Sequence, residues 1–284
     1  MPKIMLLLLI IGLCFANQSC TQEEEVPAIP TTPTAPSQPV TPKDWNDAIL
    51  VWSDEFDGDA VDTSKWLFET GDHGWGNSER QNYTAGSNAM VSDGTLKIIT
   101  TLDNGRYESS RLNSKEAFKY GRMEVRAKIP EHKGPGLWPA IWMLGENIQE
   151  AGWPLCGELD LMEYVSFDPG KVHQTIHSEA NNHTKGTQIS SGARSLPTID
   201  EEFHNYGMLW DETTLRFYID DIENVMLRFN QPQIRSQENW PFDQPFYFLL
   251  NTAVGGSWGG QQGIDDSIFP AVFEIDYVRV YQFD

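Results

Sequence analysis

Three acidic residues lie within six positions of an otherwise apolar segment, the run ELDLME at 158–163. Side chains alternate between the two faces of a strand, so Glu158 and Asp160 share one face and the leucines share the other. Strict alternation would direct Glu163 into the core, where an unpaired charge is very costly. One extra residue, a β-bulge around Leu161-Met162, returns Glu163 to the face of the other two acids.

Carboxylates grouped in this way suit the hydrolysis of glycosidic bonds, in which one carboxylate attacks the anomeric carbon and another protonates the leaving oxygen. Three crowded acids cannot all be ionised cheaply, so the pKa of at least one must rise, as an acid catalyst requires. The alternative is a solvated edge strand, whose acids usually alternate with Lys, Thr or Arg. Here the alternating residues are Leu, Leu and Met, followed by Tyr164-Val165, which favours a central strand with a catalytic face.

Tryptophan is abundant, with ten residues in the chain, and aromatic residues make up 12% of it. Four of these indoles lie in blocks that are candidates for sugar binding, namely Trp138, Trp142, Trp153 and Trp258. A tryptophan-rich core is one explanation. Ten indoles exceed what a single core usually needs, so we expect some of them to form a platform on which the apolar faces of sugars stack.

The charge balance is strongly acidic, with 41 Asp and Glu against 20 Lys and Arg and a formal net charge of −21. Nucleic acids and other polyanions need basic patches, so they are not expected as partners. Sulfated and uronic polysaccharides are disfavoured more weakly. A neutral polysaccharide is the expected partner, and the chain is expected to be a monomer.

Residues 1–19 are typical of an export signal, because their apolar run at 4–15 is too short to span a bilayer. The end of this signal resembles a lipobox, in which Cys20 is lipidated after cleavage, although Asn17 departs from the usual Leu or Val. The acidic stretch TQEEE (21–25) resembles an export tag of surface lipoproteins. We therefore expect an outer-membrane lipoprotein exposed on the cell surface, with ordinary secretion as the alternative.

Residues 20–43 are rich in Pro and Thr and cannot bury a core, so we expect an extended linker. Globular sequence occupies 44–284 without an internal repeat or a second linker, which predicts one domain. Cys156 is the sole cysteine of that part, so neither a disulfide nor a zinc cluster is available. We expect Cys156 to be a small buried hydrophobe.

The pattern of the globular part is β throughout. At Arg122–Ile129, charged and apolar residues alternate as in a half-buried strand. Similar patterns occur at Thr95–Thr101, Val172–Ser178, Asn205–Asp211, Leu215–Asp220, Phe246–Thr252 and Val272–Phe283. Turn dipeptides separate these segments, and no window shows convincing helical periodicity. The expected fold is all-β, a two-sheet antiparallel β-sandwich of the jelly-roll, concanavalin-like type.

Seven sequence blocks between Trp52 and Tyr281 carry a family resemblance. They are WSDEFDG (52–58), GWGNSERQNYT (74–84), YGRMEVRAKIP (120–130), LWPAIWMLG (137–145), GELDLMEYV (157–165), LLNTAVGGSWGG (249–260) and IDYVRVYQ (275–282). With them the chain resembles the bacterial laminarinases, endo-β-1,3-glucanases of glycoside hydrolase family 16. The E-x-D-x-x-E signature of that family is matched in full, and its bulged form resembles the laminarinase, agarase and carrageenase side of the family.

The resemblance implies roles for the three acids. Glu158 is the implied nucleophile of a retaining hydrolysis, and Glu163 is the implied acid/base. Asp160 would hold Glu158 in place and tune its protonation. No cofactor is implied for catalysis.

Further candidates for binding sugar are weaker. They comprise polar residues from three segments, Asn77 and Glu79, Arg111, and His177, besides the four tryptophans. Turn residues and an outward strand arginine are the alternatives for the first three. His177 shares a strand face with His173 and would flank the acids if the next strand pairs beside theirs, although a strand histidine is more often structural.

Three further positions match those that bind calcium on the opposite sheet in relatives: Glu55, the backbone carbonyl of Gly94, and Asp276. Oxygen ligands from distant segments suit a structural Ca²⁺. Ordinary surface carboxylates are the alternative.

The expected function is therefore retaining endo-hydrolysis of β-1,3-glucans such as laminarin. Mixed-linkage β-glucan or agar are alternative substrates on the same fold. A glucan-binding surface protein is the alternative class, but non-catalytic relatives have lost one or both catalytic glutamates, and both are present here.

Overall fold

The structure is a computed structural model that describes residues 44–284 of the chain. The predicted signal peptide, the lipidation site Cys20 and all of the predicted linker lie outside these residues and stay predictions. None of the helices within 44–284 has the length and apolar character needed to cross a membrane.

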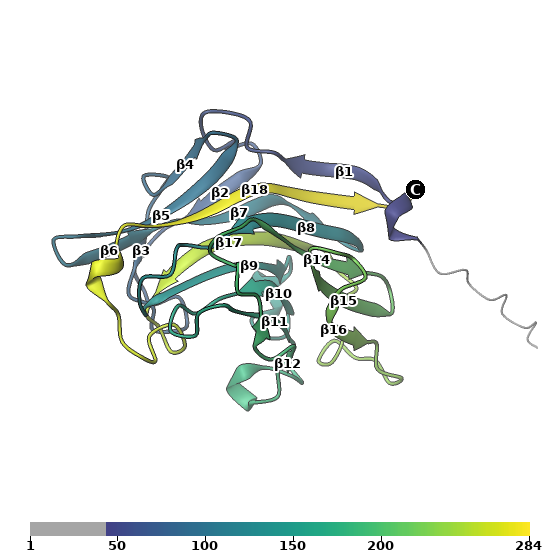
Figure 1. Cartoon of the computed structure of the whole chain (residues 1–284). Coiled ribbons are helices and arrows are strands. Elements are labelled where there is room, and N and C mark those ends of the chain that lie inside the picture. The colour runs from purple at the N-terminus through teal and green to yellow at the C-terminus, as the bar shows by residue number, and fades with distance from the viewer. Residues whose placement is uncertain (1–43) are drawn as a thin grey trace, which may run out of the picture. The chain divides into compact units, whose positions relative to one another are not determined.

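Two sheets make up the described part (Figure 1). The ten-stranded sheet runs in the order β16 (Val225–Asn230), β15 (Thr214–Ile219), β14 (His204–Trp210), β8 (Gly121–Lys128), β18 (Ala271–Gln282), β5 (Thr95–Asp103), β6 (Arg106–Ser109) and β3 (Asn82–Tyr83), while β1 (Ile49–Asp54) pairs with β18 and β4 (Ala89–Ser92) with β5. The eight-stranded sheet runs β12 (Ile189–Ser190), β11 (Lys171–His177), β10 (Glu158–Glu163), β9 (Leu137–Gly145), β17 (Phe246–Val254), β7 (Arg111–Phe118) and β2 (Trp66–Glu69), while β13 (Arg194–Ser195) pairs with β11. The remaining elements are α1 (Ile148–Ala151) and the 3-10 turns η1 (Trp45–Asp47), η2 (His183–Lys185) and η3 (Asp266–Ile268).

The predicted all-β fold with two antiparallel sheets is confirmed. Within residues 44–284, β3 and β6 pair in parallel and the other strand pairs are antiparallel. The seven strands predicted from alternation correspond to β5, β8, β11, β14, β15, β17 and β18, with ends that differ by no more than two residues. The short α1, a single turn of four residues, was not expected from the sequence.

The core lies between the two sheets, which are stacked in Figure 1. Alternation explains how it forms: on β8, Met123, Val125 and Ala127 are fully buried, and the charged residues between them face outward. On β10, the core side is supplied by Leu159 and Leu161. The side of the eight-stranded sheet that faces away from the core is thereby left for polar chemistry.

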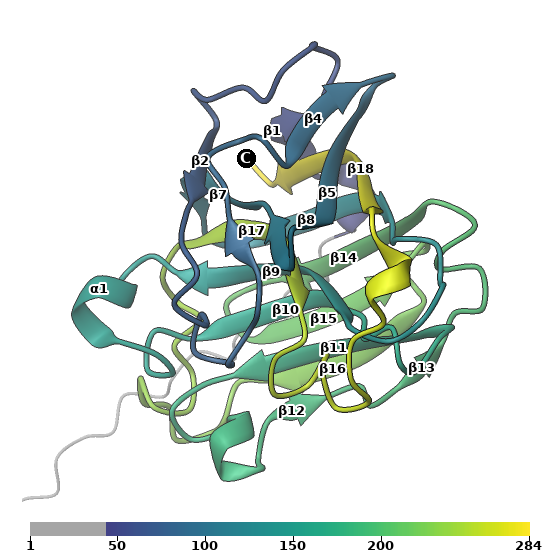
Figure 2. The same ribbon diagram turned by 90° about the vertical axis from the view of Figure 1, so that its left-hand side faces the viewer.

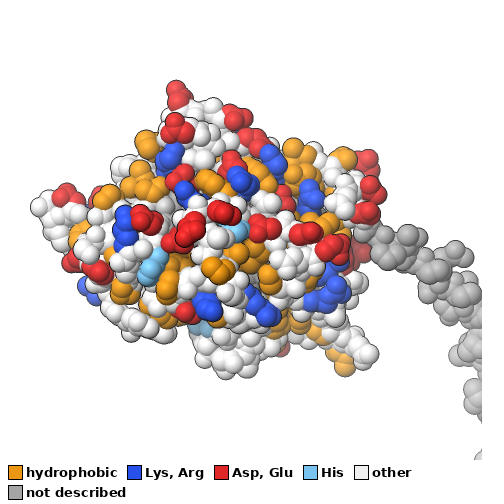
Figure 3. All heavy atoms as spheres, in the orientation of Figure 1, with side chains coloured by type: hydrophobic (Ala, Val, Ile, Leu, Met, Phe, Trp, Pro, Cys, Tyr) orange, Lys and Arg blue, Asp and Glu red, His pale blue; other side chains and the backbone are white. Residues whose placement is uncertain are grey.

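Charged side chains of both signs cover the face drawn in Figure 3. On that face, Lys and Arg are interspersed with Asp and Glu. Among the described residues, ion pairs join Arg279 to Glu55 and Lys128 to Glu274.

The segments of the predicted calcium site meet at β18. This strand pairs with β5 up to Ile275 and with β1 from Val278 onward, so Asp276 lies between the start of β5, which follows Gly94, and the end of β1, which precedes Glu55. The convergence fits a cation held by oxygen ligands. The two carboxylates already have arginine partners, however, because Arg279 donates to Glu55 at 3.0 and 2.7 Å and Arg126 donates to Asp276. Calcium therefore stays a prediction, and the ion would compete with these arginines.

Chelation tests this prediction. If Ca²⁺ binds the folded chain, a calcium chelator should lower the melting temperature by several degrees, because a free ion at about 100 times its Kd stabilises the folded state by about 2.7 kcal/mol. Asp276→Ala should abolish the response to chelator, and the exposed-site variant Glu223→Ala should retain it. A melting curve of the wild type that chelator leaves unchanged would contradict calcium binding.

Candidate active site

The predicted bulge in β10 is confirmed. Glu158 and Asp160 pair in one register with both neighbouring strands, and the register then shifts by one residue before Glu163. The shift falls at Leu161-Met162, and both of these side chains are fully buried in the core. Two consecutive residues thus face the core, and Glu163 returns to the face of the other two acids.

A buried glutamine satisfies the backbone of this bulge. The side-chain amide of Gln174, on the neighbouring strand β11, donates to the Leu161 carbonyl at 3.1 Å and to the Tyr218 carbonyl at 3.3 Å. Gln174 itself is fully buried. Since an unpaired buried carbonyl is costly, this amide compensates for the ladder bond that the bulge interrupts.

The registers place a defined neighbour beside each acid. Glu158 lies opposite His177 on β11, Asp160 lies opposite Thr175, and Glu163 lies opposite His173. Figure 2 shows β9, β10 and β11 lying next to one another in the sheet. The predicted position of His177 beside the acids is thus confirmed.

Indole and hydroxyl groups hold the outer two acids. Trp153 Nε1 donates to Glu158 Oε2 at 3.0 Å, and Trp138 Nε1 donates to Glu163 Oε1 at 3.2 Å. Thr175 Oγ1 donates to Glu163 Oε2 at 3.3 Å. Each glutamate is therefore oriented by a tryptophan.

The side chain of His177 faces Glu158 and Asp160. Its Nε2 lies 3.6 Å from Glu158 Oε1 and 3.4 Å from Asp160 Oδ2. The side chain of Asp160 is only 4% exposed, against 17% for Glu158. Asp160 is thus the buried member of the cluster, between two acids that reach the surface of the cleft.

Burial raises the pKa of all three carboxyl groups, and repulsion from Asp160 adds to it for the two glutamates. Burial is the main cause that raises the pKa of Glu158 to about 8 and of Glu163 to about 8, and in each case the charge of Asp160 adds to the effect. Burial also raises the pKa of Asp160 well above its usual range. His177 and the indole hydrogen bonds act in the opposite direction on the two glutamates. Near neutral pH the cluster consequently shares protons and carries fewer than three charges.

The acids line a cleft of about 380 Å³. Its walls contain Trp75, Trp138, Trp142 and Trp153, so rings flank the carboxyl groups from several segments. Three of these tryptophans were predicted from the sequence, and Trp75 was not. A cleft with aromatic walls and convergent polar groups is typical of a ligand site, and indole rings suit the apolar faces of sugars.

Arg111 also lines the cleft, as predicted, but its contacts are with protein groups. Its guanidinium carbon lies 4.7 Å from the ring centre of Trp75 and 4.8 Å from that of Trp142. It also donates a hydrogen bond to Glu69. Arg111 thus connects two aromatic walls through cation–π contacts.

Glu79 is mostly buried and belongs to a polar network beneath the cleft. It accepts hydrogen bonds from Asn77 at 3.2 Å, from Gln81 at 2.7 Å and from Tyr83 at 3.4 Å. Burial raises the pKa of Glu79 despite these bonds. Asn77 and Glu79 both line the cleft, so the prediction that they bind sugar hydroxyls stays open.

The same network reaches Trp142 through a residue that the sequence analysis missed. Asn251 Nδ2 donates to Tyr83 Oη at 3.0 Å, and its Oδ1 accepts from Trp142 Nε1 at 2.8 Å. Asn251 lies on β17 and lines the cleft. Only strand pairing brings it opposite Ala140 of β9, so no local sequence signal identifies it.

Trp258 packs edge-on against Trp138 at 5.4 Å and against His173 at 4.9 Å between ring centres. Its side chain is half-buried, and it supports Trp138, which lines the cleft. The prediction that Trp258 contacts sugar stays a prediction. The glycine-rich loop of Trp258 folds back on β9, where the sequence alone could not place it.

Cys156 is buried as predicted. It packs with Leu144 and Leu249, next to Trp142 and Trp153. Burial raises the pKa of its thiol to about 12, so it remains protonated at neutral pH.

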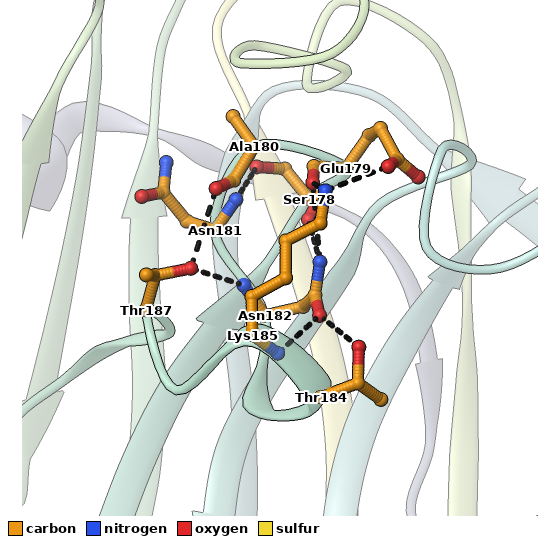
Figure 4. A network of polar contacts seen from close by, with 8 residues as sticks. All are labelled: Ser178, Glu179, Ala180, Asn181, Asn182, Thr184, Lys185 and Thr187. Carbon is orange, nitrogen blue, oxygen red and sulfur yellow. Dashed lines mark hydrogen bonds and ion pairs between the residues drawn. The ribbon is translucent and has the colours of Figure 1, made fainter.

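The loop from Ser178 to Thr187 forms one wall of the cleft, and Figure 4 shows the network of polar contacts within it. Its centre is the fully buried Asn182, whose Nδ2 donates to the carbonyls of Ser178 and Glu179 at 3.0 and 3.1 Å. Asn182 Oδ1 accepts from Thr184 Oγ1 at 2.6 Å and caps the turn η2 through the Lys185 amide. These bonds fix the backbone of the loop at the cleft.

The same loop brings two further residues to the cleft, His183 and Thr184. The ring of His183 lies 5.0 Å from Trp153 and 5.3 Å from His177. Neither residue was predicted from the sequence, although the Asn182 cap and the Gly186 after η2 are a recognisable turn signal. His73 and Gly76, from the loop that carries Trp75, are further cleft residues that were missed.

The geometry supports acid-assisted nucleophilic displacement at an acetal carbon. Two glutamates on one face of β10 are oriented by separate donors and open to an aromatic cleft, and the third acid between them is buried. One carboxylate in such a pair can attack while the other delivers a proton.

Comparisons with known proteins agree with this chemistry. A family model described as "Glycosyl hydrolases family 16" matches residues 77–279. A "Beta-glucanase" from Rhodothermus marinus is 45% identical over 247 residues, which cover 82% of this chain and 85% of the relative. The crystal structure of a laminarinase from Flavobacterium sp. UMI-01 shares 42% identity with a TM-score of 0.76, covering 82% of this chain and all of that one. A structure of a "non-specific endo-beta-1,3(4)-glucanase" shares 40% identity with a TM-score of 0.77, covering 83% of this chain and 91% of that one.

The raised pKa of Glu163 predicts a pH-dependent cost in stability. Between about pH 4.5 and pH 8, the unfolded chain has an ionised Glu163 while the folded chain keeps it protonated. The folded state then binds more protons, so this group makes the fold less stable as pH rises, by up to about 1.4 kcal/mol per pH unit. Glu163→Gln removes the effect, and its melting temperature relative to wild type should rise by up to about 3–6 °C per pH unit in that window.

Thermal melts of both proteins across that range provide the measurement. The exposed-site variant Glu202→Gln is the matched control and should follow the wild type at every pH. A difference between Glu163→Gln and wild type that stays constant or shrinks with rising pH would contradict the raised pKa.

Proposed function

The chain belongs to glycosyl hydrolase family 16, and we propose that it hydrolyses internal β-1,3-glucosidic bonds of laminarin-type glucans with net retention of configuration. It is a glycoside hydrolase with the endo-β-1,3(4)-glucanase activity of its relatives. The finer proposal concerns the linkage, the substrate and the roles of the acids. It is supported chiefly by the bulge of β10, which lines up Glu158, Asp160 and Glu163 in a cleft walled by tryptophan.

In the first step, Glu158 attacks the anomeric carbon and the bond from that carbon to the glycosidic oxygen breaks. Glu163 transfers its proton to the departing oxygen, so the leaving chain is released as a neutral alcohol. The assignment of Glu158 as nucleophile is supported by the position of His177. Its Nε2 lies 3.6 Å from Glu158 Oε1, although its charge lowers the pKa of both glutamates. The Trp153 indole, bonded to Oε2, keeps Oε1 free to act.

In the second step, a water molecule takes the place of the leaving chain. Glu163, now ionised, removes a proton from this water as it attacks the anomeric carbon, and the bond to Glu158 breaks. Two displacements on opposite faces of the sugar restore the original configuration. Asp160 acts through Glu158, since its charge and its position beside His177 set the protonation of the nucleophile.

Mixed-linkage β-glucan is the second candidate substrate. It is favoured by the similarity to a non-specific endo-β-1,3(4)-glucanase, which is 40% identical to this chain. Both substrates are neutral glucose polymers and suit aromatic cleft walls equally. Agar is a more distant alternative, and a binding-only function would leave the acid pair without a role.

A panel of purified polysaccharides tests the substrate. Laminarin should be hydrolysed at least about tenfold faster than agar or carrageenan, a ratio that needs only about 1.4 kcal/mol of differential transition-state binding. Reducing ends measure the rate, and product sizing should show an early fall in chain length, as internal cleavage requires. Glu158→Ser is the blank for contaminating activity. Faster turnover of agar or carrageenan would refute the assignment to β-1,3-glucan.

The roles of the two glutamates are tested by variants whose losses of activity should differ between substrates. Glu158→Ser should lose hydrolysis of laminarin, and azide should restore cleavage of an activated glycoside by giving a product of inverted configuration. Glu163→Ala should slow laminarin by about 10²–10⁴-fold, the usual contribution of a general acid. Activated aryl glycosides should be slowed far less, because their leaving group needs no proton. Asp160→Asn should be impaired less than either.

Proton NMR of the first products from wild type gives the stereochemistry. The β-anomer should appear before mutarotation, and Glu202→Gln should behave as wild type in every assay. An initial α-anomer, or equal loss on aryl and natural substrates in Glu163→Ala, would overturn the assigned roles.

A further inference from the structure

Three side chains of the active site, Glu158, Asp160 and His177, each offer one ligand atom for a metal ion, and these atoms all lie within 4.8 Å of one another. The closest approaches of His177 Nε2 are to Glu158 Oε1 and Asp160 Oδ2. The imidazole nitrogen is 3.6 Å from the first oxygen and 3.4 Å from the second. Two hard oxygens and one imidazole nitrogen form a mixed set of metal ligands.

The separations match a small tetrahedral cation. Bonds of about 2.0–2.1 Å from Zn²⁺ to nitrogen or oxygen place neighbouring ligand atoms roughly 3.4 Å apart. The two measured separations from His177 lie close to that value. The two carboxylate oxygens lie within 4.8 Å of each other, so rotation of a carboxylate side chain would complete the set of ligands.

The ligand atoms also lack other partners. Asp160 is 3% exposed, and its Oδ2 accepts no hydrogen bond from any residue in 44–284. Glu158 uses Oε2 for the Trp153 indole, which turns Oε1 toward His177. A buried carboxylate oxygen without a donor is costly, and a bound cation would remove that cost.

We infer that Glu158, Asp160 and His177 form a binding site for a divalent transition-metal ion such as Zn²⁺ or Co²⁺. The cleft side supplies the fourth position to a water molecule, as in open zinc sites. A dication also neutralises the buried carboxylates that otherwise must share protons. Ca²⁺ and Mg²⁺ do not fit, because they prefer six or more oxygen ligands and this site offers two oxygens and a nitrogen.

Metal binding at this site and hydrolysis of the glycosidic bond are mutually exclusive. The ion occupies Oε1 of Glu158, the oxygen proposed to attack the sugar. The consequence for activity rests on the proposed function, whereas metal binding itself does not. The site would make the enzyme sensitive to transition metals and insensitive to calcium at the same position.

Titration of the full chain with Co²⁺ tests the site directly, with a fixed excess of Ca²⁺ to saturate any calcium site. Wild type should bind cobalt saturably and develop the intense visible absorption of a tetrahedral Co²⁺ complex. His177→Gln should weaken cobalt binding by roughly tenfold or more, since even partners outside the first coordination shell contribute 10–100-fold. The matched control is His204→Gln, which changes a histidine paired with Asp220 on the other sheet and should leave the titration unchanged.

Asp160→Asn gives a second, independent variant and should weaken cobalt binding in the same way. A laminarin oligosaccharide should displace cobalt from wild type, and Zn²⁺ should inhibit hydrolysis until a chelator is added. Cobalt held elsewhere, for instance by the thiols of Cys14 or Cys20, would survive both variants. Binding that both variants leave intact, or no saturable binding at millimolar Co²⁺, would overturn the metal site, whether or not the chain hydrolyses glucan.

Discussion

The site depends on a single backbone irregularity, the extra residue in β10 at Leu161-Met162. A regular strand would place Glu163 in the core beside the leucines, and the acids could not share a face. The irregularity interrupts the ladder, and the buried amide of Gln174 compensates by bonding the Leu161 carbonyl. The catalytic arrangement therefore rests on a residue of the neighbouring strand that never meets the substrate.

Once the acids share a face, the residues around them must stabilise their charges against burial and mutual repulsion. The side chain of Asp160 is almost fully buried, and its charge adds to the effect of burial on both glutamates. The outer two are stabilised by indole donors, Trp153 for Glu158 and Trp138 for Glu163. The same tryptophans form walls of the cleft, so the residues that orient the acids also shape the space for the sugar.

Patterns with a short period were enough to predict seven of the strands, the bulge and the cluster of three acids, because alternation and the cost of a buried charge act within a few residues. His177 was also located correctly, since β11 follows β10 and pairs with it. Other parts of the cleft depend on contacts between distant segments. Asn251 reaches the cleft through the pairing of β17 with β9, and Trp75 is placed by its contact with Arg111. The contact of Trp258 with Trp138 likewise depends on the path of its loop, which is set by tertiary packing.

The wall formed by Ser178–Thr187 is held mainly by bonds among its own residues, with Asn182 at its centre, and by a further bond from the Ala180 amide to Glu238 (Figure 4). The conformation of the loop is therefore determined mainly by its own residues and depends little on contacts with the sheet. Evolution can exchange such a segment as a unit, together with His183, while the acids on β10 remain untouched. The substrate that the cleft recognises can therefore change while the catalytic chemistry is preserved.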